Sequence, residues 1–231
     1  MGWGEAAEVI VIILLFGPPG CGKGTQAAFI TRRYRFPAVS TGEVLRAEVK
    51  AETDLGKAAS AIMAAGGLVG DDVINPMVAK RIAQPDCARG FLLDGYPRTV
   101  PQAEFLTELL AARGLPKPVA IHIDVPAAAI VARITSRRQC PACGKIYNTI
   151  SQPPLVEGIC DADGTALITR ADDTEEVVRK RLRAYEEATG PVIEYYRRDG
   201  IHRVDGTSTP TEIQREIEGL LPPASSAATA Q

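Results

Sequence analysis

The sequence predicts an α/β fold in which helices flank a parallel sheet of five strands. Short apolar runs alternate along the chain with segments of helical periodicity, the order that a parallel sheet with crossover helices requires. The first apolar run also passes directly into a glycine-rich turn and then into a helical pattern. We expect strands over residues 9–16, 36–39, 90–94, 118–125 and 201–204.

Capping signals delimit the helices. The run Ser-Thr-Gly-Glu that starts at Ser40 has capping-box spacing, and Asp173 with Glu176 repeats that logic. Gly66-Gly67 and Gly114 are typical of helix ends. Helices are expected over about 24–34, after Ser40, from Asp54 to Met63, and over 72–84, 101–113, 126–137, 174–188, 191–199 and 210–220. The residues between about 138 and 172 lose helical periodicity and carry three of the five cysteines, so they predict a separate small module.

Composition excludes several classes of function. A net charge of −2 with 23% charged residues provides no basic field for a nucleic acid or an anionic membrane. The longest apolar run, residues 9–16, is far shorter than the ~20 residues of a membrane helix. The first residues lack the basic stretch of a signal peptide, so we expect a cytoplasmic protein. The sequence leaves open an organelle route through the short N-terminal extension.

The run Gly-Pro-Pro-Gly-Cys-Gly-Lys-Gly-Thr after the first predicted strand indicates a phosphate cradle. Gly20, Gly22 and Gly24 let the backbone curl so that its N–H groups point into one concavity. A helix that begins near Lys23 adds its positive end, and the lysine can reach terminal phosphates. The spacing fits the P-loop pattern, although the hydroxyl comes one place late, at Thr25. We therefore predict a nucleoside triphosphate site.

A second segment, residues 90–98, ends a buried strand with an acid. Asp94 would lie at the ligand-bearing edge of the sheet, where an acid beside a P-loop holds Mg²⁺, usually through water. The alternative is that Asp94 caps the following turn. Arg98 follows four residues later and can form a forked contact with a phosphate.

Cysteines in residues 138–172 have metal-ligand spacing. Cys140-Pro-Ala-Cys143 and Cys160-Asp-Ala-Asp163 are separated by sixteen residues, which is typical of a structural zinc site if Asp163 is the fourth ligand. Asp161 competes for that place. A disulfide from Cys140 to Cys143 or Cys160 is the rival interpretation, disfavoured in a reducing cytosol. Four protein ligands leave no open position, so such a zinc ion would stabilise a module too small for its own core.

Long motifs in a fixed order resemble the adenylate kinases. They are G-P-P-G-C-G-K-G-T-Q, S-T-G-E-V-L-R-A, F-L-L-D-G-Y-P-R-T-V-P-Q-A-E, R-I-T-S-R-R, R-A-D-D-T-E-E-V-V-R-K-R-L and V-D-G-T. The resemblance covers about residues 9–221 and indicates the long-lid form, in which some members have a similar Cys3Asp site. It implies a P-loop core of residues 1–39, 70–135 and 174–221, an AMP-binding insert of residues 40–69 and a lid of residues 136–173. Residues 222–231 would be a disordered tail.

The resemblance also implies the site residues. ATP, with Mg²⁺, would be held by Gly20, Cys21, Gly22, Lys23, Gly24, Thr25, Arg133, Arg137, Ile146, Tyr147 and Ser208. AMP would be held by Thr41, Arg46, Gly67, Leu68, Val69, Gly95, Tyr96, Pro97, Arg98 and Gln102, with Arg170 and Arg181 bridging the phosphates. The catalytic set would be Lys23, Asp94, Arg98, Arg137, Arg170 and Arg181. Glu43 and Tyr96 depart mildly from the usual Asp and Phe.

Two cysteines and both histidines lie outside the predicted catalytic set. We expect the helix-end amides to lower the thiol pKa of Cys21, and we expect Cys87 to be a packing residue. His122 and His202 lie in strand patterns, and no general-base histidine is indicated. Arg133 and Arg137 would share a face of the helix over 126–137.

Three alternatives to a monomeric ATP:AMP phosphotransferase stay open. The same fold could use GTP with AMP, because the donor base is poorly encoded. Another nucleoside monophosphate kinase is the second, although the long lid argues against the UMP/CMP type. A nucleotide-gated nucleic-acid-binding zinc protein is a remote third, since residues 138–172 lack a basic and aromatic stripe.

Overall fold

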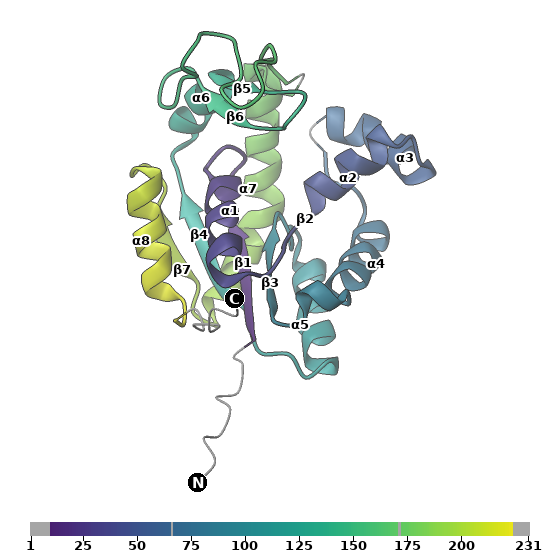
Figure 1. Ribbon diagram of the computed structural model, residues 1–231. Coiled ribbons are helices and arrows are strands. Elements are labelled where there is room, and N and C mark those ends of the chain that lie inside the picture. The colour runs from purple at the N-terminus through teal and green to yellow at the C-terminus, as the bar shows by residue number, and fades with distance from the viewer. Residues whose placement is uncertain (1–9, 66, 171, 224–231) are drawn as a thin grey trace, which may run out of the picture.

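The computed structural model describes residues 10–65, 67–170 and 172–223 (Figure 1). Expectations for Val9, Gly66 and the tail from 224 to 231 lie outside the described residues. Five parallel strands form the central sheet, as predicted, and their order is β2-β3-β1-β4-β7. They are β1 (Val11–Phe16), β2 (Ala38–Ser40), β3 (Gly90–Asp94), β4 (Val119–Asp124) and β7 (His202–Asp205).

The helices lie on both faces of this sheet and in two projections from it (Figure 1). They are α1 (Lys23–Tyr34), α2 (Thr41–Lys50), α3 (Asp54–Ala64), α4 (Asp71–Ile82), α5 (Val100–Ala112), α6 (Ala127–Thr135), α7 (Glu175–Arg197) and α8 (Pro210–Leu220), with a 3-10 turn at Pro85–Cys87. Helices α2 and α3 form one projection. The other is the cysteine-containing segment, residues 136–173, whose regular part is a hairpin of β5 (Arg137–Gln139) and β6 (Ile146–Asn148).

Strand β1 is buried along its whole length because helices cover both faces of the sheet. Its alternate side chains enter two apolar clusters. Ile13 and Leu15 belong to the α1-side cluster with Ile30, Ile130 and Ile217. Ile12, Leu14 and Phe16 belong to the α5-side cluster with Leu93, Leu106 and Val78. The central strand therefore has its carboxyl end fixed from both sides, and the phosphate loop starts there.

Helix α7 corrects the prediction of two helices over 174–188 and 191–199. It runs unbroken through Pro191. A proline removes one backbone hydrogen bond from a helix interior. The helix is nevertheless held in both halves, because Val178 lies in the α1-side cluster and Val192 in the α5-side cluster. Burial of the apolar face of α7 therefore stabilises the helix by more than Pro191 destabilises it.

Two helix-end predictions are confirmed and two are wrong. The Ser40 side chain caps α2 by accepting the Glu43 N–H, and Gly114 adopts a φ of 63° after α5. At α7 the cap is Thr174, not Asp173, whose carboxylate is engaged elsewhere. Helix α6 ends at Thr135, so Arg137 lies in β5 and shares no helix face with Arg133. No helix in the described part of the chain is long and apolar enough to cross a membrane.

Candidate active site

The phosphate loop joins β1 to α1 through three glycines with left-handed or otherwise positive φ angles. Gly17 has φ 149°, Gly20 has φ 82° and Gly22, the residue before α1, has φ 103°. A Cβ on Gly20 would lie 2.5 Å from the Ile134 side chain, so the loop packs tightly on α6. The expected curl is present, but Gly17 contributes to it in place of Gly24, which lies inside α1.

Lys23 is the first residue of α1 and turns back into the loop. Its Nζ donates to the carbonyl oxygens of Gly17 at 2.7 Å and Pro18 at 3.0 Å. A lysine cation is thereby kept among the loop's N–H groups, where a polyphosphate would bind.

Cys21 behaves differently from its predicted role as an activated thiol. Burial raises its pKa, and the nearby Lys23 ammonium only partly opposes this effect. The side chain is 1% exposed. The Lys23 backbone N–H does lower the Cys21 pKa, as the sequence indicated. The side chain is buried in the core, however, and its desolvation is the larger effect.

The carboxyl end of β3 brings the second predicted segment beside the loop. In the strand register Asp94 pairs with both Leu15 and Ser40. Its carboxylate receives no hydrogen bond from the described residues, so the alternative role as a turn cap finds no support. The Gly95 carbonyl accepts the Thr41 hydroxyl at 3.0 Å and Arg98 Nε at 2.8 Å. Burial lowers the pKa of Arg98, and Asp94 opposes that change.

Tyr96 is fully buried and contributes to the site only indirectly. Its hydroxyl donates to Asn75 Oδ1 at 2.7 Å and lies 3.3 Å from the Gln102 carbonyl. Burial raises the pKa of this phenol. The hydroxyl that Tyr96 has and the usual Phe lacks therefore links the loop after β3 to α4.

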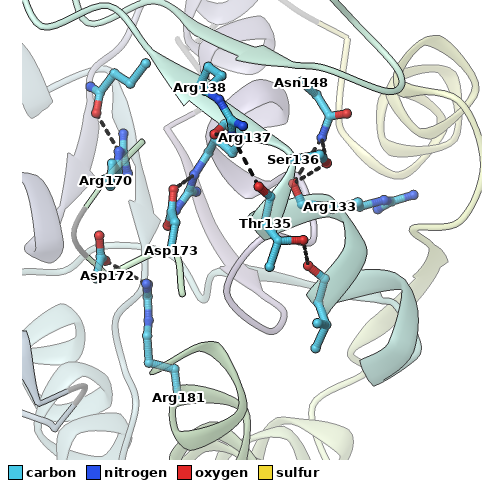
Figure 2. A network of polar contacts seen from close by, with 12 residues as sticks. Arg133, Thr135, Ser136, Arg137, Arg138, Asn148, Arg170, Asp172, Asp173 and Arg181 are labelled. Atoms are coloured by element: carbon cyan, nitrogen blue, oxygen red, sulfur yellow. Dashed lines mark hydrogen bonds and ion pairs between the residues drawn. The ribbon is translucent and has the colours of Figure 1, made fainter. Parts of the chain in front are cut away.

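Arginines from α7 and the cysteine-containing segment meet two acids (Figure 2). Arg137 forms a forked pair with Asp173, whose carboxylate is fully buried, and Nε lies 2.8 Å from Oδ2. Arg181 contacts Asp172 at 2.7 Å. Arg170 donates to the Gln139 side chain, and burial lowers the pKa of both Arg170 and Arg181.

Arg133 is held at the donor side of the site. Its guanidinium donates to the Gly206 carbonyl at 2.8 Å, close to the turn that carries Ser208. Asn148 of β6 bonds the Arg133 carbonyl at 3.0 Å and Ser136 Oγ at 2.9 Å, so the hairpin is anchored at the end of α6.

A cleft of about 850 Å³ lies between these elements, with a smaller pocket of about 100 Å³ toward α2 and α3. Every predicted nucleotide-site residue lines one or both cavities except Tyr96. The cleft is lined by Gly20, Cys21, Gly22, Lys23, Gly24, Thr25, Arg46, Leu68, Asp94, Gly95, Pro97, Arg98, Arg133, Arg137, Ile146, Tyr147, Arg170, Arg181 and Ser208. The smaller pocket is lined by residues that include Thr41, Arg46, Gly67, Leu68, Val69, Arg98, Gln102 and Arg181.

Sequence reasoning missed the groups that hold these arginines. Asp172 and Asp173 follow Arg170 almost directly, so two acids beside an arginine were an available signal. Gln139 and Asn148 gave no such signal, because their partners are distant in the sequence, and the same holds for Asp71, which bonds Gln102.

The predicted metal ligands come together in the cysteine-containing segment. Ligand atoms of Cys140, Cys143, Cys160 and Asp163 all lie within 4.8 Å of one another. Cys140, Cys143 and Cys160 are all free thiols, so the rival disulfide from Cys140 is not formed, and Cys143 Sγ and Cys160 Sγ are 3.6 Å apart, far beyond the ~2.05 Å of a disulfide. Hydrogen bonds from the Thr165 backbone and the thiols of Cys143 and Cys140 lower the Asp163 pKa. Asp161 instead accepts the Leu155 N–H and is not in the cluster.

The two histidines and Cys87 lie outside this chemistry. Tyr185 Oη is 3.4 Å from His122 Nε2, and burial lowers the His122 pKa. His202 is exposed at the start of β7. Cys87 is buried, where Arg81 donates to its sulfur at 3.2 Å.

Comparison with known proteins agrees with this geometry. The sequence profile of the family described as "Adenylate kinase" matches residues 15–201. The chain is 49% identical over 210 residues to the adenylate kinase of Trichlorobacter lovleyi, covering 90% of this chain and 98% of that protein. The adenylate kinases of Thermodesulfovibrio yellowstonii and Carboxydothermus hydrogenoformans are 46% and 45% identical over the same shares. The glycine-rich cradle and the arginine-lined cleft are thus those of a chain that belongs to the adenylate kinase family.

Proposed function

We propose that the protein catalyses the reversible transfer of a phosphoryl group from ATP to AMP, giving two ADP. The observation that carries the proposal is the single cleft in which Lys23 and the phosphate loop face Arg98, Arg137 and Arg181. Phosphoryl transfer asks the protein mainly for in-line placement and fixed positive charge. These residues supply that charge from several elements at once.

The two nucleotides would occupy opposite ends of the cleft. The loop residues 20–25, Arg133, Arg137, Ile146, Tyr147 and Ser208 would hold ATP. The acceptor would lie toward α2 and α3 on Thr41, Arg46, the Gly67–Val69 backbone, Gly95, Pro97, Arg98 and Gln102. Arg170 and Arg181 would bridge the phosphates, for which their present partners Gln139 and Asp172 would have to give way.

The nucleotide would bring Mg²⁺, which neutralises charge on the phosphates. Asp94 fits this ion, because its carboxylate offers hard oxygen ligands at the cleft beside the phosphate loop. We infer that Asp94 acts on the ion through water.

We infer that the cysteine-containing segment is the lid and that its ligand cluster holds structural zinc. Three thiols and one carboxylate within 4.8 Å are a donor set that zinc accepts. Zinc here would stabilise the segment and take no part in the chemistry. Closure of this segment over the cleft would exclude water, a competing phosphoryl acceptor.

We further infer a cytoplasmic monomer whose ligands are small nucleotides. The net charge of −2 supports no nucleic-acid partner. Equilibrium sedimentation at micromolar concentration is expected to give a single species of 24.6 kDa. A dimer mass would contradict this part of the proposal alone.

A matrix of donors and acceptors tests the reaction. ATP, GTP and UTP are each assayed against AMP, CMP, UMP and GMP, with and without Mg²⁺. The expected result is fastest turnover for ATP with AMP and loss of turnover without the metal. Preference for GTP would change the donor assignment, and preference for another acceptor would replace AMP.

A further inference from the structure

A buried hydrogen-bonded unit lies against the smaller pocket. Gln102, in the first turn of α5, is 2% exposed and lines that pocket. Its Nε2 donates to Asp71 Oδ1 at 2.6 Å, and its Oε1 accepts the Arg98 backbone N–H at 2.8 Å. The other oxygen of Asp71 accepts the Thr99 hydroxyl at 2.9 Å. Asp71 therefore joins the start of α4 to the start of α5.

These contacts allow only one orientation of the Gln102 carboxamide. An ionised carboxylate only accepts hydrogen bonds, and a backbone N–H only donates them. A half-turn of the amide would place Oε1 at 2.6 Å from an Asp71 oxygen and an NH2 group against the Arg98 N–H. Both contacts would then be repulsive, so the orientation is fixed before any ligand binds.

The chemistry of the smaller pocket suits a nucleobase. Leu45, Met63, Val69 and Ile74 supply apolar lining, while Arg46, Arg98 and Arg181 supply positive charge that exceeds the single negative charge of Asp172. The arginines match a phosphate, and the neutral amide matches a base. With its two contacts made, Gln102 still has one N–H and one lone pair on Oε1 to offer.

We propose that Asp71 is a positioning residue that sets acceptor specificity by fixing the Gln102 carboxamide. The inference rests on the proposed function. A fixed amide accepts from an exocyclic amino group and donates to the ring nitrogen beside it, as a 6-aminopurine requires. A 6-oxopurine presents the opposite pattern and would need the amide turned. Asp71 thereby favours AMP over its 6-oxo analogue IMP.

The test compares Asp71→Ser with Asp72→Ser, using AMP and IMP as acceptors. Both variants remove an acid from the first turn of α4, but Asp72 is exposed and has no contact with Gln102. In Asp71→Ser we expect the kcat/KM ratio of AMP to IMP to fall about tenfold, as expected when a site loses an oriented polar contact. KM for AMP should carry the change, while KM for ATP and kcat stay constant. Asp71→Asn, which keeps an acceptor oxygen for Gln102, should restore most of the ratio.

A double-mutant cycle separates positioning from general structure. In a Gln102→Ala background the Asp71→Ser change should have no further effect on the AMP to IMP ratio. Persistence of the full effect there would overturn the proposal, as would equal loss in Asp72→Ser. Wild-type protein that fails to use AMP would instead refute the proposed function, so the two failures are distinguishable.

If Asp71→Ser does not fold, the wild-type protein still provides a test. Nuclear magnetic resonance of the Gln102 side-chain amide, without nucleotide, should show one proton shifted downfield and protected from solvent exchange. Rapid exchange of both protons would contradict a fixed carboxamide.

Discussion

The core and the cysteine-containing segment face each other across the cleft, and different interactions stabilise them. The core buries two apolar clusters against the two faces of one sheet. Among its described residues the only apolar side chains that the segment buries are Cys140, Tyr147 and Cys160, with Leu167 packed beside them, while Leu155 is 90% exposed. Apolar burial can stabilise the core, whereas the segment has hydrogen bonds and, on the proposed function, a zinc ion in its ligand cluster.

The largest expected effect is on the segment. Cys143→Ser removes one of the four clustered ligands, and a structural zinc ion contributes on the order of 10 kcal/mol to folding. We expect wild-type protein purified without chelator to hold about one equivalent of zinc, and the variant to lose it together with protease resistance of residues 136–173. Cys87→Ser, outside the cluster, is the control and should keep the metal. Less than about a tenth of an equivalent in the wild type would refute the zinc assignment.

The second-largest expected effect is on the stability of the core. Leu93 is fully buried in β3, so Leu93→Ala should lower the free energy of unfolding of the core by about 2–5 kcal/mol. Leu155→Ala, at an exposed position, should change it by less than about 0.5 kcal/mol. Chemical denaturation measures both, and zinc content should be unchanged. A large loss in Leu155→Ala would mean that the exposed residue has a stabilising contact.

Turnover tests whether the core side carries the chemistry. Lys23→Met removes the cation held within the phosphate loop, and we expect kcat to fall at least about 10²-fold, equivalent to about 2.7 kcal/mol. Lys117→Met, at an exposed position paired with Asp199, is the matched control. Steady-state assay with ATP and AMP measures both. Normal turnover in the Lys23 variant would remove this lysine from the mechanism.

The smallest effect concerns pH. Burial holds the His122 pKa in the folded state below its ordinary value of 6.5, so the unfolded state binds more protons as the pH falls below 6.5. The contribution of His122 to the free energy of unfolding is therefore fully present above pH 6.5 and is lost progressively below it. In His122→Asn the decline between pH 7.5 and 5.5 should be shallower than in the wild type. Identical slopes in the two proteins, measured by urea unfolding, would contradict this.

The sequence predicted the features that depend on residues close to one another in the chain. The phosphate loop, the capping of α2 by Ser40 and the Cys-x-x-Cys knuckle depend on residues within one short segment, and each could be recognised from its spacing. Asp71 with Gln102 and Arg137 with Asp173 are 31 and 36 residues apart, so only the folded chain brings them together. The unbroken α7 was missed because a proline is a local signal, while the two clusters that stabilise the continuous helix are formed by distant segments.

Helix α7 would also couple the two ends of the cleft mechanically. At about 35 Å for 23 residues, it is a stiff lever. It begins beside Asp173, the partner of Arg137, and further along the Thr189 hydroxyl bonds the Arg98 carbonyl at 3.3 Å. A tilt produced when the donor side releases Asp173 would therefore be felt at Arg98, the residue whose backbone N–H orients Gln102. Occupancy at one end can in this way be sensed at the other without a contact between the two ligands.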